Sequence, residues 1–193
     1  MGHSQADKAQ THERIVAIAS RRLRERGLEG IGVADVMEEA GLTVGGFYKH
    51  FDSREALVVE ALAASFGNWQ AQIGAQATGG EKLTIDQLIG NYLSNAHRDN
   101  PGKGCAISAL AADLARSSPA TRKQCTEQVQ RNLDLVAGLL EIGDDASKQA
   151  RAIFAFSAMV GAVSLARAVC DKALSDEILA TAATRLKAMA MQG

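Results

Sequence analysis

The spacing of apolar residues predicts helices along almost the whole chain. Apolar side chains recur at intervals of three and four residues, which places them on one face of an α-helix, and no stretch shows the strict alternation of a half-buried strand. The first such series is Ile15, Ile18, Ala19, Leu23 and Leu28. The pattern therefore predicts an all-α fold of about nine helices.

Capping residues and glycines mark where the later helices are expected to begin and end. A long helix is predicted to follow Asp52 or Ser53 and to end at Gly79-Gly80. Its length of roughly 36 Å would join a small N-terminal unit to a second body. We therefore expect two domains, residues 1–55 and residues 56–193. The later helices are expected to begin at Thr84, Cys105, Ser118, Ala146 and Ser175, with a loop over residues 99–104 between the first two of them.

Residues 33–51 carry the densest local signal. A short amphipathic segment over residues 33–40 stops at Gly41, where a helix C-terminal glycine belongs. Thr43 is then expected to cap a second short helix, in which Phe47 and Phe51 are four residues apart and face inward. Two short helices joined by a glycine-containing turn form a helix-turn-helix.

The outward face of the second helix suits contact with DNA. In a helix-turn-helix this helix enters the major groove, so its exposed side chains must be small enough to approach bases or long enough to reach phosphates. Gly45, Gly46, Tyr48, Lys49 and His50 meet both demands. Each glycine costs roughly 1 kcal/mol against alanine, and close approach of DNA would explain that cost. The alternative is a plain core hairpin of two helices.

Residues 41–51 read Gly-Leu-Thr-Val-Gly-Gly-Phe-Tyr-Lys-His-Phe, and Asp-Ser-Arg-Glu-Ala-Leu follows. Over about residues 12–62 the chain resembles the tetracycline-repressor-like (TetR) transcriptional regulators, whose segment typically reads Gly-Val-Ser-x-Gly-x-Phe/Leu-Tyr-x-His-Phe. The chain departs from the family at Gly32, where Ser or Thr is frequent, and at Ala34, from which some members read a base. At these two positions the chain lacks the side chains with which the first short helix of such members contacts DNA.

The resemblance implies which residues contact DNA. Tyr48 and His50 would contact the backbone, and Arg54 stands where the family usually has a phosphate-binding lysine. The full set expected at the DNA is Thr43, Val44, Gly45, Gly46, Tyr48, Lys49, His50 and Arg54. The resemblance also implies a homodimer, paired through the last two helices as a four-helix bundle, that most often represses transcription and leaves its operator when a small molecule binds the C-terminal domain.

Charge adds local support for DNA binding. The net charge of −1 over 193 residues gives no global argument for a nucleic-acid partner. Residues 41–51 contain no acid, however, whereas Lys49, His50 and Arg54 can face phosphates. Sufficient affinity would then require two copies of the site in a dimer.

Other classes of protein find little support. Cys105, Cys125 and Cys170 lie far apart, and the four histidines lack metal-ligand spacing, so we expect no disulfide framework, metal site or cofactor. No catalytic motif appears, and an enzyme or a helical adaptor without DNA binding are the lesser alternatives. The apolar run over residues 152–166 is shorter than the roughly 20 residues of a membrane span. We expect a buried helix there and a cytoplasmic protein, since the polar N-terminus does not resemble a signal peptide.

The second domain offers two candidate ligand features. An apolar pocket is expected between the long helix and its neighbours, although such residues are more often plain core. Its candidate lining is Phe66, Trp69, Ile73, Tyr92, Leu110, Phe154 and Met159. Cys105 opens a helix near Lys103, a location that stabilises a thiolate and would suit an electrophile or oxidant sensor. The alternative is a small residue packed at a helix start.

Overall fold

A computed structural model describes residues 5–75 and 82–191, and the side chains of residues 68–75 lie outside that description. The described part contains helices and no strands, which confirms the all-α prediction. The N-terminal elements are α1 (Gln5–Arg26), α2 (Val33–Glu39), the 3-10 helix η1 (Val44–Lys49) and α3 (Arg54–Ala75). The later elements are α4 (Ile85–Tyr92), α5 (Asn95–Asp99), the 3-10 helix η3 (Pro101–Lys103), α6 (Ala106–Ala115), α7 (Pro119–Leu139), α8 (Asp145–Ala168) and α9 (Lys172–Ala190).

Three of the predicted helix starts are confirmed by their capping bonds. The Ser53 hydroxyl accepts from the Ala56 amide, and the Ser118 hydroxyl accepts from the Thr121 amide. Thr84 forms a full capping box with Gln87, in which each side chain accepts from the other residue's amide. These starts can be predicted from the sequence because each cap is an interaction between residues close together in the chain.

Two boundary predictions are wrong. The last helix begins one turn earlier than Ser175, because Asp171 accepts hydrogen bonds from the Ala173 and Leu174 amides. Ser175 is buried inside this helix and donates to the Ala166 carbonyl. Residues 99–104 were expected to form a loop, but they hold the end of α5 and the whole of η3. The predicted stop at Gly79-Gly80 lies outside the described residues.

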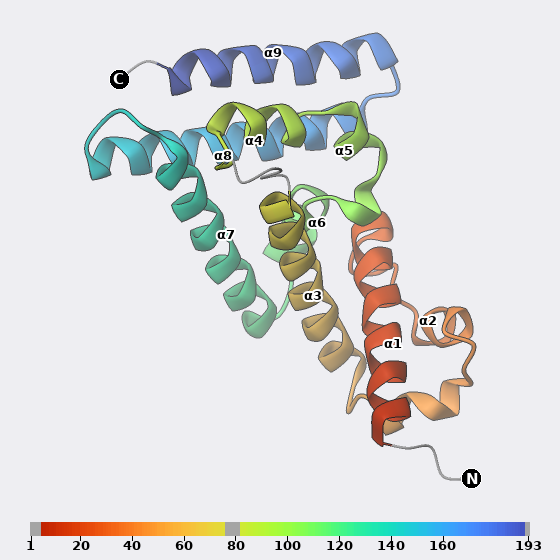
Figure 1. Cartoon of the computed structure of the whole chain (residues 1–193). Coiled ribbons are helices and arrows are strands. Elements are labelled where there is room, and N and C mark those ends of the chain that lie inside the picture. The colour runs from red at the N-terminus through yellow and green to blue at the C-terminus, as the bar shows by residue number, and fades with distance from the viewer. Residues whose placement is uncertain (1–4, 76–81, 192–193) are drawn as a thin grey trace.

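The helices form a small N-terminal unit and a larger helical body (Figure 1). Ile15, Ala19 and Leu23 are fully buried where α1 packs against α3. Both helices run from the N-terminal unit toward the body, where α8 packs between α7 and α9. Because α3 begins at Arg54 and continues into the body, the division at residue 55 stays a prediction.

The apolar run over residues 152–166 lies within helix α8. Of the described helices, α8 is long and apolar enough to cross a membrane by length and composition, a test that core helices also pass. Ala155, Met159 and Val163 are buried against the rest of the chain. This agrees with the expected buried helix, although α8 also carries an exposed apolar face, described below.

Candidate DNA-binding site

The turn and η1 are fixed by buried aromatic residues and one glycine. Gly41 has a φ of +69° and lets the chain leave α2 sharply, after which the Leu42 amide donates to the Met37 carbonyl at 2.8 Å. Phe47 and Phe51 are buried and their rings stack at 5.5 Å. Thr43 occupies the N-cap position, but its hydroxyl accepts no capping bond, so the expected side-chain cap is wrong.

Burying these two rings turns the other side of η1 outward. Val44 is half exposed, and the Tyr48 side chain is 75% exposed. Thr43, Gly45 and Lys49 are exposed as well. Gly46 and His50 are partly exposed. The seven predicted DNA-contacting residues of this segment are therefore all at least partly exposed, and together they are called the η1 surface here: residues 43–46 and 48–50.

The fold of the chain itself does not require the two glycines of η1. A Cβ added to Gly45 would meet nothing within 4 Å, and one added to Gly46 would come no closer than 3.6 Å to the Met37 side chain. Neither glycine has a positive φ. Since glycine costs helix stability, the pair is best explained by a partner that approaches this backbone from outside.

A group of basic side chains borders the η1 surface. Burial lowers the pKa of His50, and the nearby charges of His12, Lys8 and Lys49 lower it further. His12 stacks on Phe51 at 4.4 Å, and its Nε2 lies 2.6 Å from Glu60. Lys8 and His12, one turn apart on α1, were missed from the sequence because only the fold brings them beside η1. The positive charges of Lys8 and Lys49 at this edge favour phosphate groups electrostatically.

The arginines near the site are held by the chain itself. Arg21 and Arg22 both form ion pairs with Glu39 of α2, which lower the Glu39 pKa through hydrogen bonding. Arg24 is buried and donates to the Gly102 carbonyl. Arg54 donates to the carbonyls of Leu28 and Ile31 and so fixes the segment between α1 and α2. Its expected phosphate contact stays a prediction.

The candidate effector residues do not lie together. Phe66, Tyr92, Leu110 and Met159 are buried, but of these Tyr92 and Met159 line one small cavity between α4, α7 and α8. Phe154 is 61% exposed and faces away from the body, so its predicted place in the pocket is wrong, and Phe156 faces the cavity instead. The side chains of Trp69 and Ile73 lie outside the described residues.

Cys105 is buried in the core rather than exposed to solvent. It is 2% exposed, and burial raises the pKa of its thiol, although a hydrogen bond with Tyr92 acts in the opposite direction. The expected activation by a helix N-terminus is therefore outweighed by desolvation. The geometry therefore favours the alternative of a small residue packed at a helix start over a reactive sensor thiol. In the described residues, no group of three or more His, Cys, Asp or Glu side chains is placed to hold a metal ion.

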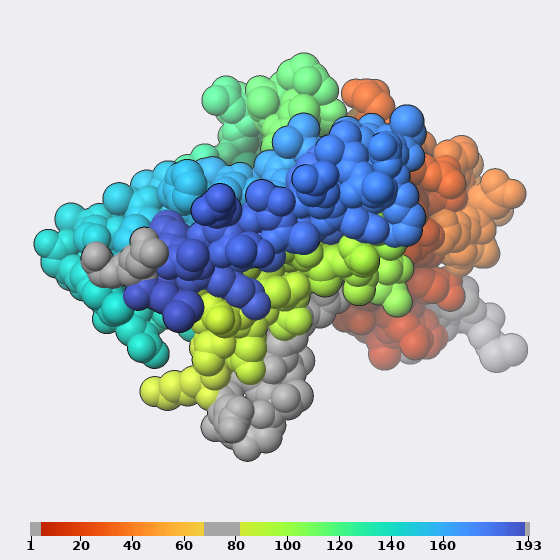
Figure 2. Space-filling model, turned by 90° about the horizontal axis from the view of Figure 1, so that it is seen from above, coloured from red at the N-terminus to blue at the C-terminus, as the bar shows by residue number. Residues whose placement is uncertain are grey.

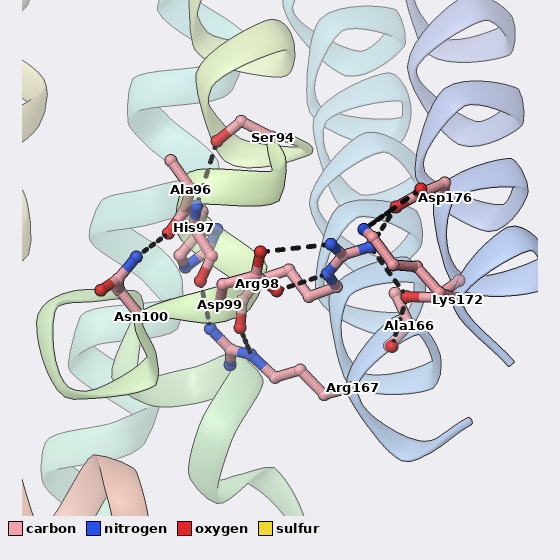
Figure 3. A network of polar contacts seen from close by, with 11 residues as sticks. Ser94, Ala96, His97, Arg98, Asp99, Asn100, Ala166, Arg167, Lys172 and Asp176 are labelled. Carbon is pink, nitrogen blue, oxygen red and sulfur yellow. Dashed lines mark hydrogen bonds and ion pairs between the residues drawn. The ribbon is translucent and has the colours of Figure 1, made fainter. Parts of the chain in front are cut away.

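Next to Cys105, a polar network joins α5 to α8 and α9 (Figure 3). Arg167 of α8 donates to the carbonyls of His97 and Arg98. Arg98 in turn forms ion pairs with Asp99 and with Asp176 of α9, which raise the Arg98 pKa. This network anchors the end of α5 and the chain that leads into α6.

Comparison with known proteins identifies both halves of the chain. Residues 15–61 match the family model of bacterial regulatory proteins, tetR family, and residues 83–183 match the model of the transcriptional regulator LmrA/YxaF-like C-terminal domain. The HTH-type transcriptional repressor NemR of Escherichia coli K12 is 24% identical over 69% of this chain and 68% of its own length. The repressor DhaR of Mycobacterium sp. (strain GP1) is 27% identical, over 58% of this chain and 56% of DhaR.

Solved structures show the same fold over nearly the whole chain. A TetR transcriptional regulator from Chloroflexus aurantiacus superimposes with a TM-score of 0.78 at 24% identity, covering 97% of this chain and 98% of the other. The reduced form of E. coli NemR gives a TM-score of 0.75 at 21% identity, covering 92% and 95%. At these identities the likeness establishes the arrangement of the helices.

Proposed function

The chain belongs to the tetR family of bacterial regulatory proteins, and we propose from this premise that it is a DNA-binding transcriptional repressor that a small-molecule effector releases from its operator. The observation that carries DNA binding is the η1 surface. It combines exposed Tyr48 and Lys49 with two glycines that the chain's own packing does not need. An external partner that approaches η1 closely accounts for all four residues.

The test is an electrophoretic mobility shift with duplex DNA from upstream of the protein's own gene. Tyr48→Ala and Lys49→Ala are each expected to weaken binding by roughly 1 to 3 kcal/mol, because each removes a contact from an exposed side chain. Binding should also fall steeply with salt, since phosphate contacts release counterions. Lys123→Ala, an exposed lysine of α7, is the matched control and should bind normally. Unchanged affinity in both η1 variants would contradict the proposal.

We also propose that two copies pair through α8 and α9. These helices form one broad face of the molecule (Figure 2). The exposed large apolar residues on them are Ile153, Phe154, Leu165 and Leu174, and the exposed Met191 follows directly after α9. Gly161 lies among them on α8, and a Cβ there would meet nothing within 4 Å. An apolar face with small residues suits close helix contact with a second copy.

The effector is proposed to enter the helical body, at the cavity between α4, α7 and α8. No described feature favours the alternatives of Cys105-based sensing or of an adaptor that has lost DNA binding. The first needs an accessible, low-pKa thiol, whereas Cys105 is buried with a raised pKa. The second would leave the outward glycines and basic edge of η1 without a role.

A further inference from the structure

The cavity between α4, α7 and α8 contains one polar group that its surroundings do not satisfy. Its lining includes the apolar side chains of Leu88, Val136, Phe156 and Met159, together with Asn132. Asn132 is 4% exposed, and within the described residues its Nδ2 has no hydrogen-bond partner. A buried donor without an acceptor costs folding free energy, so such groups call for an explanation.

The orientation of this amide is set by its neighbours on α7. Arg131, which can only donate, donates from Nε and Nη2 to Gln128 Oε1 at 3.1 and 3.0 Å. Gln128 is 1% exposed, and its other amide atom, Nε2, therefore donates to Asn132 Oδ1 at 2.9 Å. The oxygen of Asn132 is thus occupied, and the atom left over at the cavity is a donor. Arg131 and Gln128 act as positioning residues for it.

We propose that the effector is an uncharged, mostly apolar molecule with one hydrogen-bond acceptor, such as a carbonyl or ether oxygen, which accepts from Asn132 Nδ2. This rests on the proposed function, because it names the kind of ligand that the helical body would take. A charged ligand is disfavoured because the described lining offers no cation or carboxylate to pair with it. The phenol of Tyr92 stays neutral, since burial raises its pKa well above the ordinary value.

The size of the cavity connects binding to a change of shape. Its volume is about 10 Å³, which is at the limit for a single water, whereas small-molecule sites occupy hundreds of Å³. A ligand must therefore separate α7 from α4 and α8, and the unbranched Met159 side chain can adapt to it. Because α7 also packs against α3, which leads to the η1 surface, the expanded body would favour a different placement of that surface.

The test compares two probes of nearly the same shape, benzophenone, which has a carbonyl oxygen, and diphenylmethane, which lacks it. Binding is measured by calorimetry on the full chain without DNA. The wild-type protein is expected to bind benzophenone about tenfold more tightly than diphenylmethane, through the added hydrogen bond. Asn132→Leu should bind the two probes equally. Gln130→Leu makes the same kind of change on an exposed part of α7 and should keep the wild-type preference.

Equal binding of the two probes by the wild-type protein, an unchanged preference in Asn132→Leu, or no saturable binding of either probe would overturn the proposal. If Asn132→Leu does not fold, Asn132→Ala, which cannot clash with the lining, serves for the same comparison. Operator binding is measured separately on the same proteins. If the protein prefers benzophenone but does not leave DNA, control of repression by an effector is refuted, and the proposed site at Asn132 remains supported. If the protein leaves DNA without preferring benzophenone, only the proposed site at Asn132 is refuted.

Discussion

Gly45 and Gly46 are glycines that the fold of the chain does not require, and a binding partner is the proposed reason for them. A glycine required by the fold shows a positive φ or a crowded Cβ position, as at Gly104, where a Cβ would lie 2.5 Å from the His97 ring. Neither condition holds at Gly45. Its cost in helix stability is therefore uncompensated within the chain, and DNA binding is the proposed compensation.

Gly45→Ala is accordingly expected to keep or raise stability, by about 0.5 to 1 kcal/mol, while it weakens operator binding. Thermal unfolding and mobility shifts on the same preparation measure the two effects. Gly67→Ala on α3, another position where a Cβ meets nothing within 4 Å, should gain similar stability without losing affinity. A Gly45→Ala variant that binds DNA as tightly as this control would show that the backbone of η1 is not approached closely.

Single residues also mark how far the sequence could be read. The outward set at η1 was predictable because the resemblance and the four-residue spacing of Phe47 and Phe51 are local. Asn132 was not, since one polar residue on an apolar stripe looks like a surface position until three helices close around it. Phe154 was misplaced for a related reason: on a helix that is apolar nearly all round, periodicity does not distinguish the inward face from the outward one.

Among the elements, the segment from α5 to α6 is held partly by long-range hydrogen bonds. Local caps predicted where α4 and α7 begin, but α5 and η3 are also held by distant residues: Arg167 donates to the His97 and Arg98 carbonyls, and Arg24 donates to the Gly102 carbonyl. The His97 ring adds two bonds to residues nearby in the chain: its Nδ1 lies 2.6 Å from the Tyr92 carbonyl, and the Cys105 amide donates to its Nε2 at 3.0 Å. Nε2 must be unprotonated to accept this bond, so the element's geometry requires a neutral imidazole.

This requirement predicts a pH dependence of stability. Burial lowers the pKa of His97 to about 4, against 6.5 for the unperturbed group. Between these values the unfolded chain binds a proton that the folded chain does not, so stability falls as the pH drops from about 6.5 toward 4, by about 3 kcal/mol in all. Denaturant unfolding at a series of pH values measures this loss.

The matched variant is His97→Gln, whose side-chain oxygen can still accept from the Cys105 amide but does not titrate. Between about pH 6.5 and pH 4, the variant should lose less free energy of unfolding than the wild type. The difference between the two losses is the contribution of His97. The remaining loss would include His50, whose pKa is also lowered by burial. Parallel stability curves for the two proteins would exclude His97 as a source of acid sensitivity.

The whole molecule combines an exposed apolar face on α8 with a net charge near zero. A monomer of net charge −1 that exposes Ile153, Phe154 and Leu165 on one helix would tend to associate without specificity. Pairing through α8 and α9 would cover these side chains. It would also supply the second η1 surface that a weakly charged chain needs to bind an extended, near-palindromic duplex.

Gly161→Arg tests this arrangement without disturbing the chain's own packing. Because a Cβ at Gly161 meets nothing within 4 Å, the substituted subunit should fold normally, yet a close helix crossing has no room for the guanidinium and would bury its charge unpaired. Sedimentation is expected to show monomers, with near-wild-type helicity by circular dichroism and loss of high-affinity operator binding. Gly138→Arg, an equally open position on α7 rather than on α8 or α9, should remain dimeric. If Gly161→Arg sediments as an intact dimer, the subunits pair through a different surface, and the exposed apolar residues of α8 must be covered in some other way.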